Sequence, residues 1–140
     1  YSYDGTLRAI EQSLLRLATG HIDIALIHDV DVHTHGRDGV DARFAEAMDG
    51  AYRALVALKR DGTVRAIGVG VNEADIAARF ARAGEFDCML LAGRYTLLEQ
   101  GAQDDFLPLA ALAIESFRSN ESPSAHYARW GRAGCAAGGR

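Results

Sequence analysis

The chain has 140 residues, of which 49% are hydrophobic and 24% are charged, a balance typical of a folded globular domain with an apolar core. Its formal net charge of −4 and its scattered basic residues argue against nucleic acid or an anionic membrane surface as a partner. The sequence has no apolar run near the ~20 residues that cross a bilayer and no signal-peptide pattern, and Cys88 and Cys135 lack a metal-binding spacing, so we expect a cytoplasmic protein.

The first elements predicted along the chain are a helix and a buried strand. Apolar residues recur at helical spacing over residues 7–17, and Asp4 is placed to cap the start of this helix, which we expect to end near Gly20. Residues 22–27 are then almost wholly apolar, which is typical of a parallel strand covered on both faces. His28 comes directly after this strand.

A second helix and strand follow a polar, glycine-containing loop. A stripe of apolar residues at helical spacing predicts the helix: Phe44, Met48, Tyr52 or Ala51, Leu55 and Leu58. Gly62 closes this helix, because glycine readily adopts the left-handed conformation found at helix ends. The next strand is predicted over residues 64–71, with the sequence VRAIGVGV.

The third helix is predicted from a capping residue and an apolar side. Asn72 is placed to cap this helix, whose first turn holds acidic residues that suit the positive end of a helix. Ile76 and Phe80 form its core side, and Gly84 ends it.

The last predicted elements are a third strand over residues 86–91 and a fourth helix that begins near Asp104 or Asp105. That helix carries Phe106, Leu109 and Leu112. Residues 116–140 contain no Val, Leu, Ile or Met. We therefore divide the chain into a folded part, residues 1–112, and an irregular or disordered tail, residues 113–140.

The alternation of helices and strands predicts an α/β protein whose parallel strands are joined by right-handed crossovers. The pattern alone fits either a doubly wound sheet or part of a (β/α)8 barrel. Only three strands are visible, whereas a complete barrel takes ~250 residues. Because the chain also begins at Tyr1 without a methionine, we interpret it as a fragment.

Polar residues stand where two of the predicted strands end, which is where parallel α/β proteins bind their ligands. His28 follows the first strand and Asn72 the second. Partial burial at such a position keeps an imidazole neutral and able to donate a hydrogen bond to a substrate oxygen. The alternative is a histidine that ends its strand and bonds to a neighbouring loop, with Asp29 beside it. Spacing alone leaves both interpretations open.

The loop after His28 suggests a competing chemistry. Asp29, Asp31, His33 and His35 lie two residues apart, so an extended segment would present all four on one side, as a metal site requires. The stretch DVHTHG resembles the entrance motif of metal-dependent barrel hydrolases. The later strand ends supply no further histidine, so we expect a solvated loop and no metal site, with the hydrolase as an alternative.

A longer resemblance covers about residues 1–110. The segments DGTLRAIEQSLLRL, HIDIALIHDVD, FAEAMDGAYRALVALKRDGTVRAIGVGVNE, FDCMLLAGRYTLLEQ and FLPL, in this order, resemble the middle of an aldo-keto reductase. They are most similar to the branch that acts on L-fucose, D-threo-aldoses or pyridoxal. The resemblance implies a (β/α)8 TIM barrel, here with about three parallel strands and their flanking helices, that binds NAD or NADP.

The resemblance also implies roles for single residues. His28 corresponds to the family's catalytic histidine, which orients the substrate oxygen beside a tyrosine; that tyrosine and its lysine and aspartate partners lie upstream of the segment present here. Asn72 lies near the Ser-Asn pair that holds the nicotinamide carboxamide, although GVGVNE departs from the usual GVSNF order and Asn72 has helix capping as its other role. Lys59 is expected to be a solvated surface charge.

We therefore expect part of an NAD(P)-dependent oxidoreductase that transfers a hydride between the nicotinamide and a sugar hemiacetal or a related alcohol or aldehyde. The isolated chain is expected to be inactive. The alternatives are the metal-dependent hydrolase that uses His33 and His35, and a non-catalytic remnant whose unpaired strands and apolar surface bind a partner. The choice between NAD and NADP, the natural substrate and the oligomeric state do not follow from the sequence.

Overall fold

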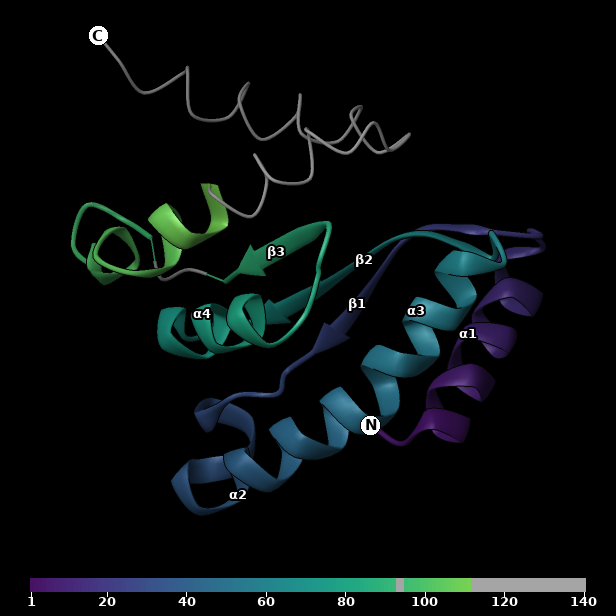
Figure 1. The fold of residues 1–140 in the computed structure, drawn as a ribbon, viewed down its shortest axis with the longest axis horizontal. Helices are drawn as coiled ribbons and strands as arrows, with labels where there is room; N and C mark the ends of the chain where they lie inside the picture. The colour runs from purple at the N-terminus through teal and green to yellow at the C-terminus, as the bar shows by residue number, and fades with distance from the viewer. Residues whose placement is uncertain (93–94, 112–140) are drawn as a thin grey trace, which may run out of the picture.

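The computed structural model describes residues 1–92 and 95–111. Their central element is a parallel sheet of three strands in the order β1 (Ile22–His28), β2 (Val64–Val71) and β3 (Cys88–Leu91), as Figure 1 shows. Helices precede β1 and connect the strands, which is the α/β arrangement predicted from the sequence. The predicted tail lies outside the described residues.

The first helix begins earlier than its apolar stripe. Helix α1 (Tyr3–Leu17) starts after Ser2, whose hydroxyl accepts a hydrogen bond from the amide of Gly5 at 3.2 Å. The prediction that Asp4 caps this helix is therefore wrong, and Asp4 lies within the first turn. The helix ends three residues before Gly20, because Ala18 adopts the left-handed conformation with φ of 50°.

The segment between β1 and β2 is helical almost throughout. Helix α2 (Val32–Glu46) is bent at Gly36, which has φ of 70°, and continues through the π-helical turn η1 (Ala47–Tyr52) into helix α3 (Arg53–Arg60). The prediction of a polar loop before the apolar stripe is therefore wrong from Val32 onward, where the chain is helical. Gly62 has φ of 86°, so the left-handed end predicted there is confirmed.

The connection between β2 and β3 differs from its prediction only at its ends. Helix α4 (Ala74–Ala83) begins after Glu73, whose backbone is extended and whose side chain does not cap it. The capping role predicted for Asn72 is wrong, because its side chain bonds to a different loop. Ile76 and Phe80 are buried as predicted.

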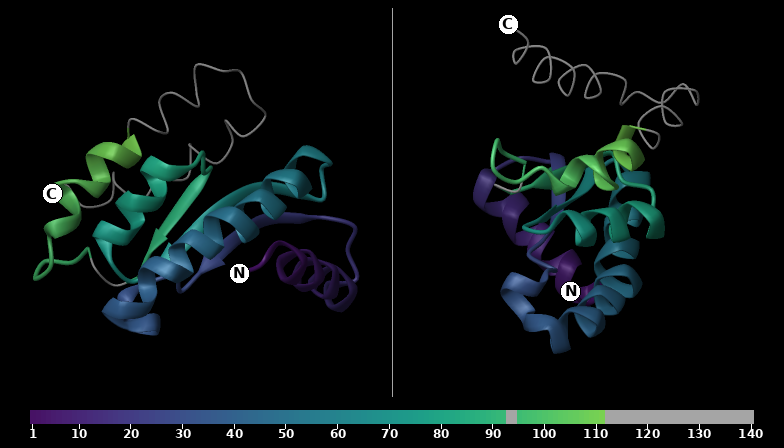
Figure 2. Two further views of the ribbon diagram at one scale, coloured as in Figure 1. Left: turned by 60° about the horizontal axis from the view of Figure 1, so that its bottom comes forward. Right: turned by 90° about the vertical axis from the view of Figure 1, so that its left-hand side faces the viewer.

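The C-terminal part described by the structure is short and lies beside α4. Strand β3 begins two residues later than the predicted strand. After the short helix η2 (Gly101–Gln103), residues 106–111 are helical, close to the predicted start, and Leu112 lies outside the described residues. Figure 2 shows this helix alongside α4, and the ion pair between Arg82 and Asp105 joins the two segments.

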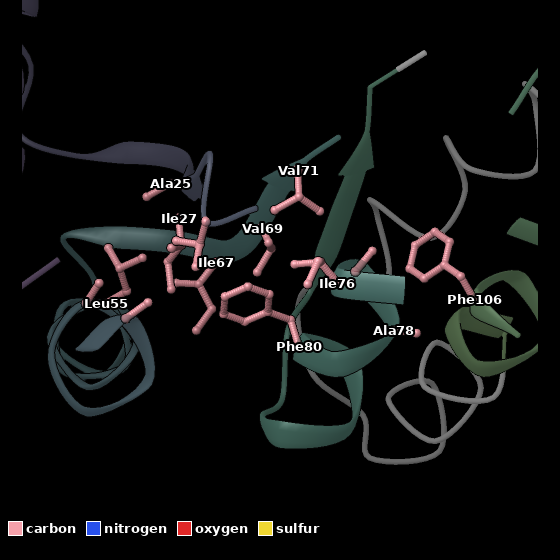
Figure 3. Close-up of a cluster of buried hydrophobic side chains, with 14 of the residues drawn as sticks. Ala25, Ile27, Leu55, Ile67, Val69, Val71, Ile76, Ala78, Phe80 and Phe106 are labelled. Atoms are coloured by element: carbon pink, nitrogen blue, oxygen red, sulfur yellow. The ribbon is translucent and has the colours of Figure 1, made fainter. Parts of the chain in front are cut away.

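The helix-covered face of the sheet holds the core. Parallel pairing sets Ala25 opposite Ile67 and Ile27 opposite Val69, so these four side chains share one face. Phe80 of α4 packs against this face, and Leu55 of α3 lies at its other end, as Figure 3 shows. The core therefore lies between the sheet and its helices, as expected for βα units.

The opposite face of the sheet is open in the described residues. Ile24 of β1 is 43% exposed and Leu90 of β3 is 53% exposed. The expectation that the first strand is covered on both faces is therefore wrong for the described chain. No helix in the described ranges is long and apolar enough to span a membrane.

Candidate active site

His28 lies at the carboxyl end of β1 on the open face of the sheet. The register places it in one row with Gly70 of β2 and Leu90 of β3. A Cβ atom built on Gly70 would lie 2.9 Å from Cδ2 of His28, closer than carbon atoms approach without strain. The imidazole therefore lies over Gly70, in space that any other residue would fill.

The His28 ring is held by its neighbour in sequence. Nδ1 of His28 lies 2.9 Å from Oδ2 of Asp29, and the His28 side chain is 63% exposed. The expected partial burial is therefore wrong for the described residues. The alternative interpretation is a bond from His28 to a neighbouring loop with Asp29 beside it, and the structure shows that Asp29 itself contacts the ring. Both features can coexist with catalysis, because Nε2 has no hydrogen-bond partner among the described residues.

The backbone at the end of β1 is fixed from two sides. Asp29 has φ of 57°, and its amide donates to the carbonyl oxygen of Gly70 at 2.9 Å. The hydroxyl of Tyr1 lies 2.9 Å from the carbonyl oxygen of His28 and 3.1 Å from Nε2 of His35. Burial, together with the negative charge of Asp29, raises the pKa of Tyr1, so this hydroxyl stays protonated.

Asp31 joins the loops that follow β1 and β2. Its side chain is fully buried. One carboxylate oxygen accepts from the amide of Thr34 at 2.9 Å, and the other accepts from the amide of Asn72 at 3.0 Å and from its Nδ2 at 2.6 Å. Burial disfavours the charged form, but the hydrogen bonds from Thr34 and Asn72 outweigh it and hold the pKa of Asp31 below its ordinary 3.8.

Glu73 makes the reciprocal connection. Its two carboxylate oxygens accept from the amides of Val32 at 2.9 Å and His33 at 3.1 Å, which are free donors in the first turn of α2. Helix α2 is thus capped by Asp31 and by a residue from the next loop. Sequence analysis missed this role, because Glu73 is 41 residues from Val32 and has the local pattern of an acid in the first turn of its own helix.

The structure does not form the metal site considered for the loop after His28. Asp31 is the N-cap of α2, and His33 and His35 lie in its first turn rather than in an extended segment. His35 faces the ring of Tyr1 at a centroid distance of 5.8 Å. The described residues contain no group of three or more side chains able to hold a metal ion.

Lys59 lies outside the candidate site and has a structural role. Its Nζ lies 2.6 Å from both carboxylate oxygens of Asp87, whose side chain is 3% exposed. Asp87 also accepts from the amide of Ile67 at 2.8 Å. The prediction of a solvated surface charge is therefore wrong, and the ion pair fixes the chain just before β3.

Comparisons with known proteins agree on one family. Residues 1–113 match the model of the aldo/keto reductase family. The chain is 40% identical over 110 residues to pyridoxal 4-dehydrogenase of Microbacterium luteolum, covering 79% of this chain and 32% of that protein. It is 34% identical over 111 residues to D-threo-aldose 1-dehydrogenase of Pseudomonas sp, covering 79% of this chain and 31% of that protein.

The chain also has a partial match among solved structures. An aldo/keto reductase from Brucella melitensis has 30% sequence identity and a TM-score of 0.44, over 58% of this chain and 27% of that chain. The chain spans about a third of the length of the curated relatives that it matches.

Proposed function

The chain belongs to the aldo/keto reductase family, and from this membership we propose that it is part of an NAD(P)-dependent dehydrogenase that oxidises a hydroxyl-bearing carbon. Its three parallel strands are a part of the (β/α)8 barrel of that family. The proposed substrates are small molecules, either sugar hemiacetals or alcohols related to pyridoxal, because the relatives are named for an aldose and for pyridoxal. We place the enzyme in the cytoplasm.

The observation that supports this proposal is the position of His28. The ring stands at the carboxyl end of β1, over a glycine, with Nε2 free of partners in the described chain. Enzymes with parallel barrels bind substrate at this end of the strands. We propose that Nε2 orients the reacting oxygen of the substrate by a hydrogen bond.

The residues at the end of β2 fit a nicotinamide cofactor. One N–H of the Asn72 side chain bonds to Asp31, which leaves the second N–H and Oδ1 as a donor and an acceptor. A carboxamide has the complementary acceptor and donor, so Asn72 would hold the amide of the nicotinamide. When bound, the cofactor supplies the hydride acceptor.

The described residues supply orientation rather than the proton carrier. The family pairs its acid/base tyrosine with a lysine, and the lysine of this chain is engaged by Asp87 at the opposite end of the sheet. Lys59 is the only lysine in the 140-residue sequence, so the family's acid/base tyrosine has no lysine partner within this chain. We therefore propose that the 140-residue chain alone forms no reduced nicotinamide from pyridoxal or D-threo-aldoses.

A chimera tests the proposal. Residues 1–110 of this chain would replace the matching segment of pyridoxal 4-dehydrogenase, and formation of reduced nicotinamide would be followed by absorbance. We expect an active chimera in which His28→Ala lowers kcat by ~100-fold or more, since the loss of one positioned hydrogen bond to a reacting oxygen costs ~10²–10³ in kcat. Affinity for the cofactor should stay within about twofold.

A second histidine provides the control. His33 lies five residues further on, is exposed, and only its backbone amide takes part in the loop network. His33→Ala should leave kcat of the chimera unchanged. An active chimera whose kcat is as high with alanine as with histidine at position 28 would refute the proposed role.

A further inference from the structure

The buried carboxylate of Asp31 determines how the side-chain amide of Asn72 is oriented. The lowered pKa of Asp31 keeps it ionised at neutral pH, and an ionised carboxylate only accepts hydrogen bonds. The Asn72 atom that lies 2.6 Å from Oδ2 of Asp31 must therefore be the donor, Nδ2. Because an asparagine can present either end of its amide to a neighbour, this contact fixes Oδ1 on the side away from Asp31.

The same carboxylate also holds the backbone of Asn72. Oδ2 of Asp31 accepts from the backbone amide of Asn72 at 3.0 Å as well as from Nδ2. The other oxygen, Oδ1, accepts from the amide of Thr34 at 2.9 Å, which fixes the plane of the carboxylate. Asp31 is fully buried. Asn72 is therefore held at two atoms by a group that is itself fixed.

The rest of the Asn72 amide is open to a ligand. Its Oδ1 has no hydrogen-bond partner in the described chain, and no side-chain nitrogen or oxygen there is both buried and unpartnered. Oδ1 of Asn72 therefore reaches the surface. It offers an acceptor, and the second hydrogen of Nδ2 offers a donor. Both follow β2 directly, two residues after Gly70, which pairs with His28.

We propose that Asp31 is a positioning residue for Asn72: it holds the side-chain amide in one orientation, so that the free N–H and Oδ1 are ready for the carboxamide of the nicotinamide. This inference rests on the cofactor contact proposed above and deepens it. A side chain that is already ordered loses less entropy when a ligand binds. Asp31 therefore strengthens cofactor binding through Asn72.

The variant Asp31→Asn removes the acceptor with little change in shape. Asparagine caps helices as well as aspartate does, so its Oδ1 can keep the bond to Thr34 and the chain should fold. Its Nδ2 would then stand where Oδ2 stood and could only donate, so Asn72 should turn Oδ1 toward it. In the active chimera we expect the Kd for the oxidised nicotinamide cofactor, measured by titration calorimetry without substrate, to rise about 3–10-fold.

A double-mutant cycle shows whether Asp31 acts through Asn72. The Kd would be measured for the chimera with Asn72→Ala alone and with Asn72→Ala and Asp31→Asn together. In the alanine background we expect Asp31→Asn to change the Kd by less than about 1.5-fold. A role that only stabilises the loops would weaken binding equally in both backgrounds. Such an equal effect, or an Asp31→Asn chimera with unchanged Kd, would overturn the inference.

The orientation of the amide can be measured on the 140-residue chain itself. In ¹⁵N–¹H spectra the Nδ2 group of Asn72 gives two hydrogen signals, which Asn72→Ala identifies by their loss. The hydrogen bonded to the carboxylate should resonate downfield of the other one. This downfield shift should disappear in Asp31→Asn. Signals that are the same in both chains would show that Asp31 does not orient the amide, which also overturns the inference.

Asp75 provides the matched control. It lies three residues after Asn72, in the first turn of α4, and is exposed. Asp75→Asn removes the same charge without touching the Asn72 amide, so the Kd of the chimera and the Asn72 signals should stay unchanged. A rise in Kd as large as that in Asp31→Asn would mean that general charge, rather than the contact with Asn72, sets the affinity, and the inference would fail.

The binding and activity measurements separate this inference from the proposed function. If kcat does not depend on His28 but Asp31→Asn weakens cofactor binding only when Asn72 is present, the proposed catalytic role fails and this inference stands. If kcat depends on His28 but the cycle shows no coupling, the catalytic role stands and this inference fails. A Kd that Asn72→Ala leaves unchanged would refute the cofactor contact, and the role of Asp31 with it.

Discussion

Replacing Asp31 by alanine tests whether one buried carboxylate holds the two strand-end loops together. Its loss removes the N-cap of α2, which costs ~1 kcal/mol, and leaves the two donors of Asn72 without their acceptor, which costs ~1–3 kcal/mol. We therefore expect Asp31→Ala to lower the free energy of unfolding by about 2–4 kcal/mol. Urea denaturation followed by circular dichroism measures this value.

A control substitution at another aspartate distinguishes the loss of the Asp31 hydrogen bonds from the loss of a negative charge in general. Asp75 lies in the first turn of α4 and is exposed. Asp75→Ala removes one favourable charge near a helix start, which is worth ~0.3–1 kcal/mol. If Asp31→Ala costs no more than Asp75→Ala, the hydrogen bonds to Asn72 and Thr34 do not stabilise the fold and the reasoning is refuted.

The loss of stability caused by Asp31→Ala should depend on pH. Because the pKa of Asp31 is lower in the folded chain than its ordinary value, its contribution to stability is complete above about pH 3.8 and is lost as the pH falls through the folded pKa. The difference in unfolding free energy between the unmodified chain and Asp31→Ala should thus shrink on acidification below pH 3.8. A difference that grows in that range would contradict the lowered pKa.

Three further substitutions, with Leu97→Ala as a control, test the sheet and its core in the same assay. Lys59→Met should cost about 2–3 kcal/mol, a value reduced for the partial exposure of Lys59, because it leaves a buried carboxylate unpaired; a neutral result would show that solvent replaces the ammonium. Gly68→Ala should destabilise the sheet, since its Cβ would lie 2.4 Å from the carbonyl oxygen of Cys88; unchanged stability would mean that β3 shifts freely. Phe80→Ala should cost ~3–5 kcal/mol, whereas Leu97→Ala, at 93% exposure, should stay within ~0.5 kcal/mol; similar losses at both would contradict the assigned core.

Local patterns predicted the elements whose causes are local. Strand β2 has the predicted bounds, because a run of small and β-branched residues suits a central parallel strand. Phe80 is buried as its helical spacing predicts, and Gly62 has the left-handed conformation that ends α3. His28 stands at a strand end because the apolar run stops there. Each of these outcomes depends on neighbours within a few residues.

The features that sequence analysis missed depend on long-range contacts. Helix α2 begins at Val32 although its first turn has few strong helix formers, because Glu73 accepts from the amides of that turn. The local pattern predicts that Asn72 caps α4. In the folded chain the Asn72 side chain instead donates a hydrogen bond to Asp31. Lys59 forms an ion pair with Asp87, which lies 28 residues further along the chain. No periodicity in the sequence encodes such pairs.

Gly70 links the packing of the sheet to the chemistry proposed for its edge. The central strand has the small residues Ala66, Gly68 and Gly70 on the open face, and side chains of neighbouring strands lie over the two glycines. Gly70 leaves room for the ring of His28, and its carbonyl oxygen accepts a hydrogen bond from the amide of Asp29. The position of the imidazole and the conformation of its partner therefore depend on the same residue, so the geometry proposed for catalysis follows from the pairing of β1 with β2.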